Sequence, residues 1–246
     1  DHHGRIRIHR VRHAKAERDG SLDQATSHLL AIARIEEHDL NDITTAFATA
    51  RSAYLMDPRR FDTLDEVTRL GEALGQHRAL IGLWAAALDH ERATDKTLRI
   101  DLTGRIAKVL DEVLNLPEQA RNAYAELLKL DPPDARLVEE TVGSLCRLHM
   151  QAGDFISLVE TQQTLLKYTN QRDEQIRLRL KLAKTQLDYL FDRVGAALTW
   201  SEVLDTDPAN KEALDALEQL FVEEQEWERL DEVLTHRTDV TPDTRA

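Results

Sequence analysis

The sequence is poor in residues that interrupt helices and in residues that build sheets. Its 246 residues include only 9 glycines and 6 prolines, and aromatic residues make up 5% of the total. The β-branched and aromatic residues that favour strands are thinly spread, and no run of them alternates with polar residues between turn signals. Ala, Leu, Glu, Asp and Arg dominate instead. The composition therefore predicts an all-α fold with essentially no sheet.

Cysteine and long apolar runs are also scarce. The single cysteine, Cys146, excludes an internal disulfide and fits a reducing compartment. No stretch approaches the ~18 to 20 apolar residues that a membrane helix needs, so we expect no membrane span. These features favour a cytoplasmic location. The sequence does not begin with methionine and starts inside a helical pattern, so we expect a fragment of a longer protein.

Motifs of catalysis and cofactor binding are missing as well. The chain has no phosphate-binding P-loop, no GxGxxG, no GxSxG and no HExxH motif. Cys146 and His149 lie three residues apart, but Cys146 stands among apolar residues, which is typical of packing. His9 and His13 are spaced as i and i+4, yet they lack the further ligands of a metal site. We therefore expect no enzyme, no cofactor and no metal.

The charge of the chain is unevenly distributed. A net charge of −13 argues against general nucleic-acid binding, because affinity for phosphate depends on clustered Lys and Arg. Residues 1–18 are the exception, with six cations against two carboxylates. This segment is either a solvated, truncated helix or a contact for an acidic partner or nucleic acid. For the chain as a whole we do not expect nucleic acid as the partner.

What the sequence does contain is an internal repeat. Three Asp-Pro pairs begin at Asp57, Asp131 and Asp207, which lie 74 and 76 residues apart. Alanine stands eleven and twenty-four residues before each of these aspartates, while larger residues recur seven before in the second and third copies. The two alanine columns are Ala46, Ala120 and Ala196, and Ala33, Ala107 and Ala183. Such a period indicates a repeat architecture.

Each unit of about 75 residues is long enough for two antiparallel helix hairpins. Small residues let two helices approach closely, and a proline after Asp ends the second helix because Pro lacks an amide donor. We expect Asp131, Asp134 and Asn210 to cap the helices that follow, and Ser21 with Gln24 to form a capping box. The expected helices lie near residues 5–18, 22–38, 42–56, 60–75, 77–91, 94–114, 117–130, 134–151, 154–169, 173–190, 192–205, 210–224 and 227–237.

The three Asp-Pro hairpins resemble the tetratricopeptide repeat. The matching residues are Ala46, Ala50, Ala53 and Pro58; Ala120, Tyr124, Leu127 and Pro132; and Ala196, Trp200, Val203 and Pro208. The hairpins between them depart from the pattern, with Gly71, Leu145 and Phe221 where the first helix usually carries an aromatic residue. The resemblance implies a right-handed superhelical solenoid of about six hairpins, in a bacterial-type tandem array of paired hairpins.

The resemblance also sets the expected organisation of the chain. Residues 1–20 are predicted to be a truncated, basic helix of a preceding repeat, and residues 21–237 the tetratricopeptide-like solenoid. Residues 238–246 have no apolar period and are predicted to form a flexible polar tail. The family implies that a peptide or a partner segment lies in the concave groove, which the first helix of each hairpin lines.

One column of the repeat is chemically suggestive. Arg34, Lys108 and Lys184 directly follow the alanines of the first helices, and Arg69 stands at the comparable point of an intervening hairpin. These cations could hold an acidic segment, or they could be solvated and make local pairs such as Arg34 with Glu37. The candidate groove residues are Arg34, Glu37, Arg69, Lys108, Asp111, Arg177, Lys184 and Asp188.

Two kinds of function fit this pattern. The first is a non-enzymatic scaffold for protein-protein interaction that binds a partner segment, such as an acidic one, in the groove. The alternative is a regulator gated by a small ligand or a peptide, which would need a deep pocket with convergent polar groups. The sequence does not specify the oligomeric state.

Overall fold

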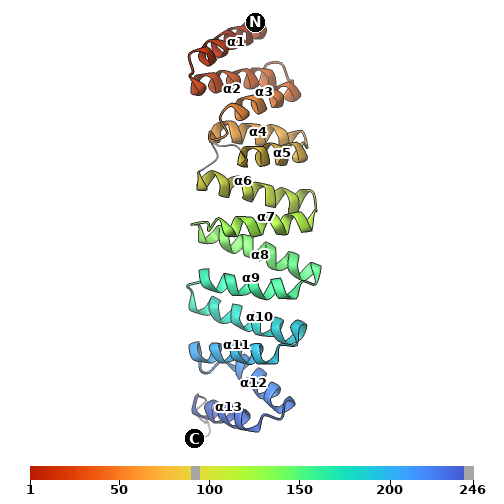
Figure 1. Cartoon of the computed structure of the whole chain (residues 1–246), viewed down its shortest axis with the longest axis vertical. Coiled ribbons are helices and arrows are strands. Elements are labelled where there is room, and N and C mark those ends of the chain that lie inside the picture. Colours follow the sequence, from red (N-terminus) through yellow and green to blue (C-terminus); the bar gives the residue numbers. More distant parts are fainter. Residues whose placement is uncertain (90–94, 241–246) are drawn as a thin grey trace. The chain divides into compact units, whose positions relative to one another are not determined.

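The computed structural model describes residues 1–89 and 95–240, and these residues form helices and turns without a strand (Figure 1). The chain divides into two compact units, Asp1–Asp131 and Pro132–Ala246. The first unit contains α1 (His2–Arg18), α2 (Leu22–His38), α3 (Ile43–Met56), α4 (Phe61–Ala73), α5 (His77–Leu88), α6 (Lys96–Lys108), the π-helical turn η1 (Val109–Val113) and α7 (Pro117–Lys129).

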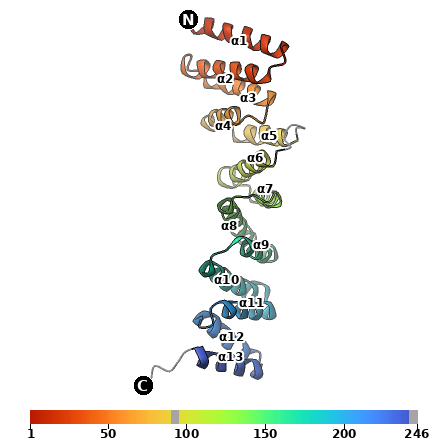
Figure 2. The same ribbon diagram turned by 90° about the vertical axis from the view of Figure 1, so that its left-hand side faces the viewer.

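The second unit contains α8 (Ala135–Ala152), α9 (Phe155–Tyr168), α10 (Arg172–Leu190), α11 (Arg193–Thr206), α12 (Lys211–Glu223) and α13 (Trp227–Val240). Within each unit, every helix packs mainly against the helix before it and the helix after it. Figure 2 shows these successive layers from the side. Nearest-neighbour packing of this kind is the hallmark of a helical-repeat protein.

The alanine columns explain why the hairpins form. All six alanines, which were predicted to lie between paired helices, are completely buried. The three Asp-Pro hairpins pair α2 with α3, α6 with α7 and α10 with α11. Tyr124 and Trp200, the bulky residues of the neighbouring column, are buried as well. Small residues therefore bring the two helices together, and the bulky residues fill the adjacent space.

Short polar residues define the helix starts. Asp134 accepts a hydrogen bond from the amide of Arg136, and Asn210 accepts one from the amide of Ala213. These two predicted caps are confirmed, whereas the prediction for Asp131 is wrong, because the N-cap of α8 is Asp134. Ser21 precedes α2 but its side chain makes no capping hydrogen bond, so the predicted capping box is wrong. Nothing in the structure explains this difference.

The helix boundaries agree closely with the expected ones. α13 continues to Val240, beyond the expected end at residue 237, and α6 passes into η1 before the turn at residues 114–116. Parts of the expected helices near 77–91 and 94–114, and residues 241–246 of the expected tail, lie outside the described residues. The right-handed superhelical path stays a prediction.

Candidate functional site

The candidate groove residues lie on the first helices of the hairpins. In the first unit, Arg34 and Glu37 belong to α2, Arg69 to α4 and Lys108 to α6, while Asp111 lies in η1. In the second unit, all three candidates, Arg177, Lys184 and Asp188, belong to α10. We call the exposed side of α2, α4 and α6 the first-helix face, and we define it by Arg34, Arg69 and Lys108.

Arg69 is held tightly on this face by two carboxylates. Its guanidinium donates two hydrogen bonds to the Glu37 carboxylate, at 2.8 Å and 2.5 Å, and its Nε donates to Glu66 at 3.1 Å. The hydrogen bonds from Arg69 hold the pKa of Glu37 below its usual range. Bidentate pairing of this kind fixes the orientation of the arginine. Arg69 therefore links α4 to α2.

Two further arginines of the first unit make the same kind of link. Arg60, just before α4, donates to Asp23 of α2 at 2.7 Å and to Asp62 of its own segment at 2.9 Å. Arg105 of α6 donates to Asp65 of α4 at 3.0 Å and to Asp101 of its own helix at 2.8 Å.

Each of the three arginines thus joins a carboxylate of its own segment to a carboxylate of the preceding first helix. Every such group carries one positive and two negative charges. These arginines already have carboxylate partners, and they connect neighbouring hairpins through pairs that are each worth about 0–1 kcal/mol.

Two cations of the predicted column remain. Arg34 and Lys108 are exposed, and neither takes part in an ion pair among residues 1–89 and 95–240. The local pairs that the sequence suggested are not the ones that form. Glu37 pairs with Arg69, and Asp111 accepts a hydrogen bond from the Tyr124 hydroxyl at 3.3 Å.

The candidates of the second unit are differently placed. Lys184 reaches across to Glu212 of α12 at 2.5 Å rather than to Asp188. Arg177 pairs with Glu174 of its own helix at 3.3 Å. Lys184 therefore links α10 to α12, in the same way as the arginines link the helices of the first unit.

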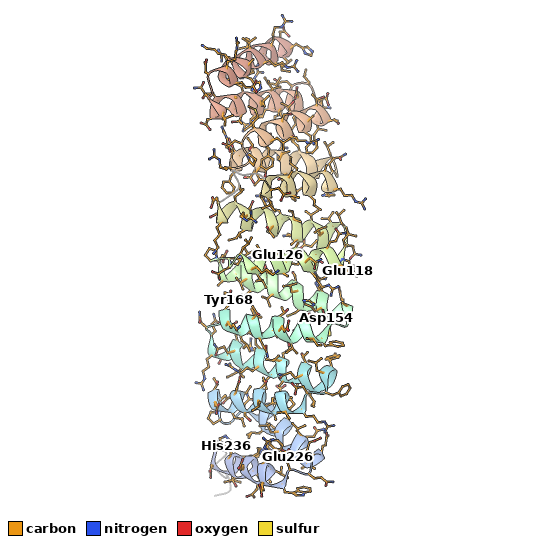
Figure 3. The ribbon with its side chains drawn as sticks, viewed as in Figure 1. Glu118, Glu126, Asp154, Tyr168, Glu226 and His236 are labelled. Atoms are coloured by element: carbon orange, nitrogen blue, oxygen red, sulfur yellow. The ribbon has the colours of Figure 1, made fainter. Side chains whose placement is uncertain are left out.

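A cavity of about 570 Å³ lies between α8, α9 and α10. Tyr168, at the end of α9, lines it together with Glu139 and Glu174, and Figure 3 shows Tyr168 at one end of α9 and Asp154 at the other. None of the eight candidate residues lines this cavity. Its charged lining residues are both acidic, so the sequence-based search for basic residues could not have found it.

The structure also places Cys146 and His9, the remaining candidates for chemistry. Burial raises the pKa of the Cys146 thiol, which favours its protonated form. His9 lies against His28 of α2, with 3.3 Å between the two Nδ1 atoms, and burial lowers the pKa of His9. Within the part of the chain that the structure describes, no three His, Cys, Asp or Glu side chains are grouped to hold a metal ion. Likewise, no described helix combines the length and apolarity needed to cross a bilayer.

Several solved structures are similar to this chain. The Naa15/Naa10 complex bound to HypK-THB contains a match that is 12% identical with a TM-score of 0.50, covering 98% of this chain and 37% of that chain. YrrB, a TPR protein with an unusual peptide-binding site, is 16% identical with a TM-score of 0.43, covering 83% of this chain and 96% of that chain. The C-terminal part of a TPR repeat-containing protein from Cytophaga hutchinsonii is 11% identical with a TM-score of 0.46, covering 98% and 96%.

No protein-family model and no curated protein matches the chain. At identities this low, a likeness to solved structures concerns the fold alone. The sequential helix packing, the buried alanine columns and the Asp-Pro helix ends define the class: an all-α array of tetratricopeptide-like hairpins.

Proposed function

We propose that this chain is a non-enzymatic scaffold for protein-protein interaction, and that a partner segment rich in Asp or Glu binds to the first-helix face of the first unit. Arg34 and Lys108 would contact its carboxylates. The observation that carries the proposal is that some cations of this unit have carboxylate partners and others do not. Arg60, Arg69 and Arg105 are used between hairpins, whereas Arg34 and Lys108 are exposed without an ion pair among the described residues.

The charge of the chain supports this choice of partner. A protein of net charge −13 repels acidic segments in general, so an acidic segment is attracted only to cations that are not already paired with carboxylates. Each arginine group on the first-helix face has an excess negative charge, which limits where such a segment can lie. The single cysteine, which is free, is in keeping with the cytoplasmic location that we propose.

The test is a charge reversal with a matched control. The chain and its Arg34→Glu, Lys108→Glu variant are titrated into a fluorescent peptide of Asp and Glu with a few Leu residues, and binding is followed by anisotropy. We expect the double variant to bind at least about tenfold more weakly, since two attractive contacts become repulsive.

The control exchanges the same charges elsewhere in the first unit. Arg51 of α3 and Arg78 of α5 are also exposed, and neither has an ion pair among the described residues, but they lie on second helices of their hairpins. Arg51→Glu, Arg78→Glu should change affinity less than about twofold at 0.15 M salt, because screening is effective beyond about 8 Å. Equal losses in both variants would mean that only net charge matters, and no loss in either would refute the proposal.

A further inference from the structure

The turn between α10 and α11 carries an unusual residue (Figure 1). Phe191 ends α10 in the left-handed region, with φ 55° and ψ 24°, and its side chain is 78% exposed. A bulky side chain is disfavoured in this backbone conformation, where Gly and Asn are the usual choices. Because the ring is exposed, it also gains no stabilisation from burial. Neither the local backbone nor the core therefore accounts for a phenylalanine here.

The internal repeat shows what the turn itself requires. Asn41 and Asn115 stand sixteen residues before Asp57 and Asp131, as Phe191 does before Asp207. Their φ angles are 54° and 50°, so all three copies share one backbone conformation. Two copies satisfy it with asparagine, which tolerates this region. The third copy has an exposed aromatic residue at this position instead.

The same replacement extends onto α11. Val194 and Leu198 lie one helical turn apart, and their side chains are 66% and 61% exposed. The corresponding residues are Thr44 and Ala48 in the first copy, and Glu118 and Asn122 in the second copy. Figure 3 labels Glu118 near the start of α7, the place that Val194 occupies on α11.

We call Phe191, Val194 and Leu198 the apolar rim of the third copy. Tyr189, two residues before Phe191, stacks on Phe155 of α9, with 4.2 Å between the ring centroids. This stack ties the end of α10 to the start of α9. A rim that is held in place offers a preformed surface, which lowers the entropic cost of binding.

The exposed charges on α10 and α11 indicate the chemistry of a partner. Asp188 lies three residues before Phe191, and Asp205 lies seven residues, or about 10 Å, beyond Leu198 along α11. Both are exposed, and neither has an ion pair among the described residues. The cation beside the rim, Arg193, is already neutralised by Glu224 and lies 4.0 Å from Glu223. Unpaired charge at this place is therefore negative.

We propose that the apolar rim is a second docking surface, and that it binds an amphipathic helical segment with an apolar stripe flanked by Lys or Arg. The apolar stripe would cover Phe191, Val194 and Leu198, and the basic flanks would face Asp188 and Asp205. This surface lies in the second unit and selects the opposite charge from the first-helix face. The two proposals can therefore be tested independently.

The test replaces the three rim residues of the third copy by the corresponding residues of the first copy. The full chain and the variant Phe191→Asn, Val194→Thr, Leu198→Ala are titrated into a labelled amphipathic peptide of Leu, Ala and Lys, about 18 residues long. The exchanged residues are neutral and already occur at these positions of the repeat, so the fold and the net charge are preserved. We expect the variant to bind at least about tenfold more weakly, because all three anchoring side chains are removed.

A matched control removes exposed apolar side chains elsewhere in the second unit. Val222→Thr, Trp227→Asn alters side chains that are 49% and 61% exposed on α12 and α13, and it should leave the affinity unchanged within about twofold. A peptide with Glu in place of Lys should bind the parent chain more weakly. The proposal is overturned if the rim variant binds the Lys peptide as well as the parent does, because attraction to an acidic protein would then explain the binding. It is equally overturned if the control loses as much affinity as the rim variant.

Discussion

The Thr49 hydroxyl of α3 donates a hydrogen bond of 2.6 Å to the Glu36 carboxylate of α2. The same relationship recurs in the third copy, where Thr199 donates to Gln186 at 2.8 Å. In both hairpins the acceptor side chain is buried between paired helices. A buried carboxylate is costly unless it accepts hydrogen bonds, so this contact locks the register of the hairpin.

Thr49→Val should destabilise the chain by about 1–3 kcal/mol, because it removes the donor from a buried carboxylate while keeping the shape of the side chain. Thr199→Val should cost less, about 0.5–1.5 kcal/mol, since its acceptor is a neutral amide. Urea unfolding followed by circular dichroism measures both. If the two substitutions cost the same, the charge of Glu36 would not be what makes the contact important.

The pairing of Arg69 with Glu37 predicts a specific dependence of stability on pH. The pKa of Glu37 is lowered in the folded chain, so the unfolded chain binds a proton at higher pH than the folded chain does. The contribution is therefore fully present above about pH 5, and it is lost as the pH falls through the unfolded value near 4.3 toward the lower folded value.

Arg69→Met should remove about 0.5–1 kcal/mol at neutral pH and should flatten the acid side of the stability profile. Thermal unfolding at a series of pH values tests this. Arg136→Met is the control, since Arg136 and its partner Glu140 are both largely exposed and lie on one helix. A profile for Arg69→Met that is parallel to that of the parent would contradict the assignment.

Much of the fold could be predicted from the sequence, because the repeat places equivalent residues in columns. The alanine columns gave the helix pairs, and the Asp-Pro pairs gave the helix ends. Such features depend on local sequence and on a period that can be counted. The groups formed by Arg60, Arg69 and Arg105 could not be found in this way. They join residues about 30 to 40 positions apart, and only the packing of one hairpin on the next brings them together.

The candidate site shows the same limit. The column of Arg34 and Lys108 was visible, but the sequence suggested that Arg34 would pair with Glu37 one turn away. In the structure, Glu37 instead forms an ion pair with Arg69 of the next hairpin. The apolar rim had a signal in the sequence, since Phe191 stands in a column of asparagines. Its significance depends on the left-handed backbone and on the exposure of the ring, which the sequence alone does not show.

Gly71 illustrates how a departure from the repeat pattern can be structural. It stands in the column of Leu145 and Phe221, and a Cβ at this position would lie 2.7 Å from Leu80 Cδ2 and 2.9 Å from Phe47 Cε2. Gly71→Ala should therefore cost about 1–3 kcal/mol through overpacking. Gly82→Ala is the matched control.

A Cβ at Gly82, within α5, would meet nothing within 4 Å. Gly82→Ala should therefore stabilise the helix by about 0.5–1 kcal/mol. Urea unfolding of both variants would show opposite shifts of the midpoint. Two shifts of the same sign would mean that helix propensity, and not the space around residue 71, controls the outcome.

Phe191→Asn should stabilise the chain, because asparagine tolerates the left-handed backbone and the exposed ring contributes little burial. We expect a gain of about 0.5–1 kcal/mol, a part of the penalty for this conformation. Phe191→Leu is the control, since leucine is equally disfavoured there and should bring no gain. Differential scanning calorimetry would rank Asn above both Phe and Leu. Retention of a destabilising residue at the rim is the expected signature of a binding surface, so a gain in stability with a loss of peptide affinity would connect the strain at Phe191 to recognition.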